Sequence, residues 1–254
     1  MEEILRVLVS LALALLLIVL RSEAETFGAA EYLEPTRDGR RASALQRLSY
    51  FLVGFALVGG ICFVHPDPPN GLGLALGDRA TAIVVGFLLG TLGTLQAIGF
   101  AYLRYRRLRF PPAWTYPGAL LNSVGTAFLD EVTFRGVVLS MVMLVGINPG
   151  TAVIFQALLY TLATRVGAPG RHWYSFVLTL ALGLATGWAT VATGAIGAAF
   201  LGHAITRFAV FLFTGHAGQV ARPGQEIEET WEYVHAPAGW RSVDEPSEPQ
   251  EPAP

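Results

Sequence analysis

The chain has 254 residues, of which 53% are hydrophobic and only 14% charged, with a mean hydropathy of +0.49. Soluble domains carry about 25% charged residues, so this composition indicates a membrane protein. The net charge of −2, from 17 arginines and no lysine against 19 acids, excludes a strongly basic nucleic-acid-binding protein and enzymes that need a phosphate-binding or Schiff-base lysine.

Long apolar segments recur along the chain, and a helix needs roughly 20 mostly apolar residues to cross a bilayer. Such segments cover about 4–20, 48–65, 81–104, 117–147, 150–166, 173–193 and 195–214. The segment 117–147 is too long for one straight crossing, so we expect it to be tilted, kinked or divided. The sequence therefore predicts an all-α, polytopic bundle of seven transmembrane helices, or eight if 117–147 is two helices.

The first apolar segment has the length of a signal peptide. It begins with Met1, Glu2 and Glu3, which is acidic where signal peptides are basic, and no clean small-x-small cleavage site follows it. We therefore interpret residues 1–20 as a retained helix.

Arginines cluster in alternate loops. Residues 21–47 hold five, 104–109 hold four and 165–171 hold two, whereas the other side holds only Arg6 and Arg79. Because arginine-rich loops stay in the cytoplasm, seven crossings with the N-terminus outside place all these loops and the C-terminal tail there. We expect a multi-pass protein of a bacterial plasma membrane.

We expect three regions along the chain. Residues 1–79 hold N-terminal helices and a cytoplasmic loop, 80–214 form the core, and 215–254 form an acidic, proline-rich tail. The end of the tail is typical of disorder, and a solubilising role is favoured over partner binding. The single cysteine, Cys62, excludes an intrachain disulfide and a cysteine-based zinc site.

Two pairs of glycines have the spacing of close helix packing. Gly86 and Gly90 are four residues apart, as are Gly183 and Gly187. Without a side chain at such positions, neighbouring transmembrane helices can approach closely. We expect these pairs to lie at helix interfaces.

Five ionisable residues lie at membrane depth, where charge costs several kcal/mol and marks a candidate functional site. Asp130, Glu131 and Arg135 share one helix, and His203 and Arg207 share another. Glu131 and Arg135 are four residues apart, hence on one face, while Asp130 points about 100° away. One acid can therefore pair with Arg135 while the other faces a partner helix or a cavity. A buried ion network that fixes helix register is one interpretation.

The strings around these residues resemble the motifs of the CPBP family, which includes the type II CAAX prenyl endopeptidases and bacterial bacteriocin-processing and abortive-infection proteins. That family has Glu-Glu-x-x-x-Arg, usually followed by Gly, then Phe-x-x-x-His and His-x-x-x-Asn or Asp. Here residues 130–136 read DEVTFRG, 160–164 read YTLAT and 203–207 read HAITR. The resemblance covers roughly residues 80–214.

The resemblance implies a polytopic intramembrane endopeptidase. Asp130 would activate a water molecule, Glu131 and Arg135 would fix the carboxylate pair, and His203 would bind water or stabilise the oxyanion. A positioned donor at an oxyanion contributes about 3 kcal/mol in known cases. The implied partners are the bilayer and a membrane-associated peptide or protein substrate, with no nucleic acid; the sequence does not specify an oligomeric state.

Three positions depart from the family motifs. Asp130 is one methylene shorter than the first Glu of the motif. Thr164 stands where the second motif has His, and a hydroxyl can hold water but cannot act as an imidazole base. Arg207 replaces the final Asn or Asp with a fixed cation, which would weaken Asp130 as a base if the two lie close.

Cofactor binding is not indicated. A zinc site normally takes three or four protein ligands, and only His203 and the two acids are on offer. A divalent metal stays an alternative with an incomplete ligand set. We predict no tightly bound zinc.

Three hypotheses for function follow. The first is a CPBP-type endopeptidase that hydrolyses a peptide bond with carboxylate-activated water. The second is a non-catalytic membrane scaffold or binding protein of the same fold, whose altered polar cluster holds helices together. The third is an unrelated channel or transporter that uses the buried charges as a substrate path.

Overall fold

The computed structural model describes residues 2–30, 42–105, 108, 110–165 and 173–214, all within one compact unit, Met1–Gln219. The acidic tail lies outside the described residues, as do residues 106, 107 and 109 of the arginine-rich loop 104–109 and all of 166–172. The predicted division into three regions and the disorder of the tail stay predictions.

Every predicted apolar segment is helical in the structure, with ends that differ by a few residues. The elements are α1 (Glu2–Ser22), α2 (Ala44–Val64), α3 (Pro68–Gly71), α4 (Arg79–Tyr105), η1 (Ala113–Thr115), α5 (Tyr116–Asp130), η2 (Glu131–Val138), α6 (Leu139–Leu144), α7 (Pro149–Arg165), α8 (Trp173–Thr193) and α9 (Gly197–Thr214). Five of them, α1, α2, α4, α8 and α9, are long and apolar enough to cross a membrane. The chain is thus an all-helical, polytopic membrane protein, as the sequence predicts.

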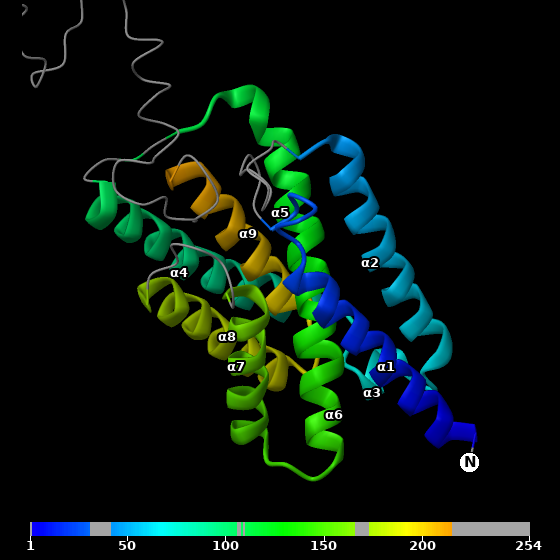
Figure 1. Cartoon of the computed structure of the whole chain (residues 1–254). Helices are drawn as coiled ribbons and strands as arrows, with labels where there is room; N and C mark the ends of the chain where they lie inside the picture. The colour runs from blue at the N-terminus through cyan, green and yellow to red at the C-terminus, as the bar shows by residue number, and fades with distance from the viewer. Residues whose placement is uncertain (1, 31–41, 106–107, 109, 166–172, 215–254) are drawn as a thin grey trace, which may run out of the picture. The chain divides into compact units, whose positions relative to one another are not determined.

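The long segment 117–147 is one continuous helix with an altered middle. Elements α5, η2 and α6 follow one another without a break (Figure 1), and the junction residues Glu131 (φ −68°, ψ −42°) and Leu139 (φ −60°, ψ −48°) have helical dihedrals. Element η2 is a π-helix, a form that occurs often at functional sites. The helix ends at Leu144, and Gly146, at φ +86°, begins the turn into α7.

Glycines of α4 bring it into close contact with α9. A Cβ on Gly86 would lie 2.8 Å from Leu201, and a Cβ on Gly90 would lie 2.8 Å from three carbons of Ile205. The reciprocal position on α9, Gly202, would place a Cβ 2.5 Å from Leu89. The predicted role of the first glycine pair in helix packing is therefore confirmed.

The second glycine pair joins α8 to α7. A Cβ on Gly183 would lie 3.0 Å from Ala157, and one on Gly187 would lie 2.4 Å from the amide nitrogen of Gln156. That same nitrogen donates a 2.9 Å hydrogen bond to the carbonyl of Gly183. Small residues and a hydrogen bond from a side-chain amide thus hold α7 and α8 together, as is common within membranes.

Apolar side chains cover the outside of the helices and polar ones lie within. Exposed large apolar residues include Leu8, Leu52, Leu88 and Trp188, whereas Asp130, Glu131, Arg135 and His203 are all at most 1% exposed. Many buried threonines donate a hydrogen bond from the hydroxyl to a backbone carbonyl of their own helix, as do Thr133, Thr161, Thr186, Thr190 and Thr206. The charged residues are left as the distinctive polar groups of the interior.

Candidate functional site

Glu131 joins two helices at the centre of the bundle. Its Oε1 lies 2.7 Å from Nδ1 of His203 on α9 and 3.3 Å from Nη1 of Arg135, one turn along its own helix. Because a carboxylate only accepts hydrogen bonds, Nδ1 carries the hydrogen and donates it to Glu131. The sequence prediction that Arg135 pairs with one acid of the motif is confirmed, and that acid is Glu131.

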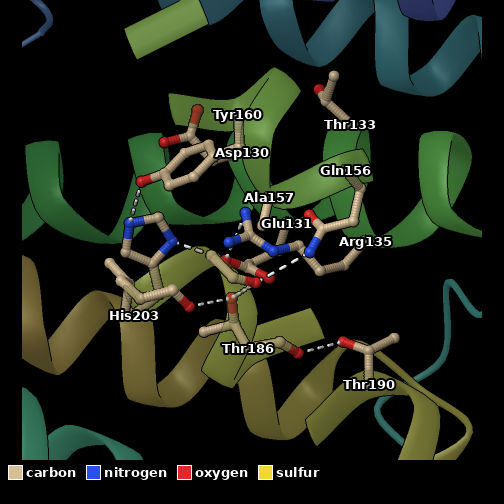
Figure 2. Close-up of polar contacts among 12 residues, drawn as sticks. Asp130, Glu131, Thr133, Arg135, Gln156, Ala157, Tyr160, Thr186, Thr190 and His203 are labelled. Atoms are coloured by element: carbon tan, nitrogen blue, oxygen red, sulfur yellow. Dashed lines mark hydrogen bonds and ion pairs between the residues drawn. The ribbon is translucent and has the colours of Figure 1, made fainter. Parts of the chain in front are cut away.

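The other ring nitrogen of His203 faces a tyrosine. Nε2 lies 3.2 Å from the hydroxyl of Tyr160 on α7, and the two rings meet edge to face with centroids 5.8 Å apart. Glu131, His203 and Tyr160 therefore form one buried row, which Figure 2 shows with its dashed lines. In the neutral imidazole, Nε2 accepts the tyrosine hydrogen, so both ring nitrogens are oriented by protein groups.

Arg135 is fully buried beside this row. Its guanidinium carbon lies 4.4 Å from the centre of the Tyr160 ring, a cation–π contact that supplements the ion pair with Glu131. None of its nitrogens makes a directed hydrogen bond within the part of the chain that the structure describes. The oxygen Oε2 of Glu131 likewise has no hydrogen-bond partner there. Buried groups of this kind are where proteins hold ordered water or ligand oxygens.

Asp130 pairs with a residue that the sequence did not single out. Its Oδ1 lies 2.8 Å from Nε of Arg21, and both side chains are buried. Sequence interpretation assigned Arg21 to a cytoplasmic loop beginning at residue 21, but α1 continues to Ser22 and carries Arg21 in its last turn. The two neighbouring acids therefore face different helices, Asp130 towards α1 and Glu131 towards α9.

Arg207 lies one turn beyond His203 on α9. Its Nη2 donates a hydrogen bond to the carbonyl oxygen of Ala30, in the segment that follows α1. Two side chains of α5, Asn122 and Thr126, donate to the neighbouring carbonyl of Ala29 at 3.3 and 3.4 Å. Residues 29 and 30 are thus bound between α5 and α9, on the stretch of α5 that leads to Asp130.

Thr164 contacts the backbone of its own helix. Its hydroxyl donates to the carbonyls of Tyr160 at 2.9 Å and Thr161 at 3.2 Å. Sequence reasoning missed Arg21 and the hydroxyl of Tyr160, because an arginine at a helix end and a tyrosine within a helix are both ordinary residues of membrane proteins. Among the described residues, no group of three or more His, Cys, Asp or Glu side chains is arranged to hold a metal ion.

The fold and this cluster define a class of protein. It is a polytopic helical membrane protein in which a buried Asp-Glu-x-x-x-Arg motif lies opposite a histidine. Residues 112–209 match the sequence model of the type II CAAX prenyl endopeptidase Rce1-like family. The match contains Asp130, Glu131, Arg135, Tyr160 and His203, whereas Arg21 precedes it. Comparison with curated proteins and with solved structures found no match.

Proposed function

We propose that the chain is an intramembrane endopeptidase that hydrolyses a peptide bond of a membrane-associated substrate with carboxylate-activated water. The observation that carries this proposal is the buried contact between Glu131 and His203, at 2.7 Å, within the family segment. A carboxylate removed from bulk water is a stronger base, and an imidazole whose Nδ1 donates to Glu131 can donate from Nε2 to a developing oxyanion once it is protonated. Catalysis is assigned to Asp130, Glu131, Arg135 and His203.

In this proposal the four residues divide the work. One acid, Asp130 by the family resemblance, takes the proton of the attacking water. Glu131 orients His203, which then holds water or the oxyanion, and Arg135 supplies positive charge and donors for water beside Glu131. The proposal includes seven crossings of a bacterial plasma membrane, with the N-terminus outside and the tail in the cytoplasm.

Reconstitution in liposomes tests this function. The protein would be incubated with a library of membrane-anchored peptides, prenylated ones included, and products would be identified by mass spectrometry. The Asp130→Ala/Glu131→Ala double variant is the control, with its folding checked by size-exclusion chromatography and circular dichroism. We expect cleavage by the natural protein alone, and the cut sites would name the substrate class. Two folded proteins that cleave nothing would contradict the proposal.

A non-catalytic scaffold or binding protein is the second candidate. It is favoured by the ion pair between Arg21 and Asp130, which engages the first acid, and by Thr164, whose hydroxyl contacts its own helix where the family has a histidine. In that case the cluster would serve to fix helix register. Equal folding and equal absence of cleavage in the experiment above would favour this candidate.

A further inference from the structure

The segment after α1, residues 23–30, is folded as a compact plug. The backbone amides of Ala29 and Ala30 both donate to the carbonyl of Ala24, at 2.9 and 3.1 Å, and all three alanines are buried. Gly28 lies within it at φ +62°, a conformation that favours glycine. Ala24, Gly28, Ala29 and Ala30 are thus buried within this segment, whereas Thr26 in its middle is exposed.

Side chains within residues 112–209, the segment that matches the family model, bind the backbone of the plug. Asn122 and Thr126 donate to the carbonyl of Ala29, and Arg207 donates to the carbonyl of Ala30. Asn122, Thr126 and Asp130 are spaced by four residues on α5, so they share one helical face. Two consecutive peptide carbonyls therefore occupy a row of donors that ends at an acid of the candidate site.

Asn122 retains an unused acceptor at this place. Its Oδ1 has no hydrogen-bond partner within the described part of the chain, although the side chain is only 4% exposed. An amide side chain can donate to a peptide carbonyl and accept from a peptide N–H at the same time. The plug uses only the donating half of that capacity, which indicates that Asn122 can bind peptide backbone more fully than the plug allows.

We propose that Asn122, Thr126 and Arg207 form a subsite for the peptide backbone of the substrate, and that residues 23–30 occupy this subsite as an internal competitor. The inference rests on the proposed endopeptidase function, and it assigns the ligand class as a polypeptide segment delivered from the membrane. Because the plug belongs to the same chain, its effective concentration is high, roughly millimolar for a short tether. A substrate must therefore displace it.

Opening of the plug is measured by cysteine labelling of the full-length protein. Ala30→Cys in a Cys62→Ser background reports exposure to a water-soluble maleimide. Gly28→Ala should speed labelling about tenfold, the effect of losing one net hydrogen bond, since its Cβ would lie 2.0 Å from that of Ala42. Gly146→Ala is the matched control, because Gly146 also has positive φ but nothing lies within 4 Å of its Cβ. It should leave labelling unchanged.

Turnover then separates an open plug from an intact subsite. Gly28→Ala should lower the apparent KM for a cleaved peptide, because the competitor is weakened. Asn122→Ala should also speed labelling, but it should raise the KM relative to Gly28→Ala, because the substrate loses the same amide. A synthetic peptide with the sequence of residues 21–30 should compete in the Gly28→Ala variant, and a scrambled peptide should not.

The outcomes distinguish this inference from the proposed function. If cleavage occurs and neither Gly28→Ala nor Asn122→Ala changes labelling or KM, the subsite is overturned and the endopeptidase stands. If neither the natural protein nor any variant cleaves a peptide, the endopeptidase fails, and the peptide of residues 21–30 tests the subsite alone. Labelling of Ala30→Cys that is faster with this peptide than with the scrambled peptide then supports the backbone-binding subsite. No difference between the two peptides overturns the subsite as well.

Discussion

Glu131 is the residue on which two buried contacts depend, since its Oε1 binds both His203 and Arg135. Glu131→Gln removes the negative charge and leaves the guanidinium of Arg135 buried without an anion. We expect turnover to be lost and the free energy of unfolding to fall by about 3–5 kcal/mol, the cost of breaking a fully buried pair. Unfolding in mixed detergent, followed by circular dichroism, measures the stability change.

Glu2→Gln is the matched control for this prediction. Arg6 and Glu2 have the same spacing of four residues and an N to O distance of 2.9 Å, but both side chains are well exposed. Exposed pairs of this kind contribute about 0.3–0.5 kcal/mol. If Glu131→Gln lost turnover yet was no less stable than Glu2→Gln, Glu131 would serve chemistry and contribute nothing to the register of the helices.

Tyr160→Phe isolates the hydroxyl that binds His203. The ring would keep its contacts with Arg135 and with Phe134, whose centroid lies 5.2 Å away, while Nε2 of His203 would lose its 3.2 Å partner. We expect a loss of about 0.5–1.5 kcal/mol in unfolding free energy, the net value of one hydrogen bond.

Tyr102→Phe, at an exposed position, provides the comparison and should change the unfolding free energy by less than about 0.5 kcal/mol. Equal unfolding free energies for the two variants would mean that the hydroxyl of Tyr160 does not hold His203. Nitrogen-15 spectra of labelled histidines would report the same loss directly, as a changed Nε2 signal of His203.

The candidate site could be predicted where charge at membrane depth made residues conspicuous. Asp130, Glu131, Arg135 and His203 were found in this way, and the structure brings Glu131, Arg135 and His203 together. Arg21 could not be found, because pairing between residues more than one hundred positions apart depends on tertiary packing. Sequence spacing places neighbours within a helix but does not say which side chain of another helix will face them.

At the scale of the element, the contact between α4 and α9 depends on glycine. Gly90→Ala would place a methyl group 2.8 Å from three carbons of Ile205, whose β-branched side chain has little rotamer freedom. We expect a loss of about 1–3 kcal/mol in unfolding free energy from overpacking. Detergent-induced unfolding of the purified variant measures it.

Gly99→Ala, on the same helix, is the control for this prediction. Nothing lies within 4 Å of a Cβ at Gly99, so the better helix propensity of alanine should leave stability equal or raise it by up to about 1 kcal/mol. Equal losses in the two variants would show that helix propensity, and not contact with α9, explains the effect.

The helices could be predicted because long apolar segments define them almost alone. Two local features could not. The π-helix Glu131–Val138 is a matter of hydrogen-bond register, and its residues suit an α-helix equally well. The position of Ala29 and Ala30 depends on donors supplied by α5 and α9, and so it appears only when the elements are assembled.

At the scale of the whole molecule, helix directions agree with alternate crossings. Contacts of Gly86 with Leu201 and of Gly90 with Ile205 make α4 and α9 run in the same direction. In seven alternating crossings both helices run inwards. We therefore expect residue 108 in the cytoplasm and residue 146 outside.

Labelling of intact cells checks this topology. In a Cys62→Ser background, an impermeant maleimide should label Gly146→Cys at once and Leu108→Cys only after permeabilisation. Division of the segment 117–147 into two crossings would place both positions on the same side. Labelling of both cysteines, or of neither, in intact cells would therefore contradict seven crossings.

The π-helix in the middle of the long helix has a mechanical consequence. Its backbone hydrogen bonds join residues five apart instead of four. The same backbone groups between α5 and α6 can therefore pair in an alternative, α-helical pattern. A shift of the ladder by one residue would rotate α5 by about 100° relative to α6. That rotation would carry Asn122 and Thr126 away from the carbonyl of Ala29. The helix that bears the acids would thus release the plug by turning about its own axis.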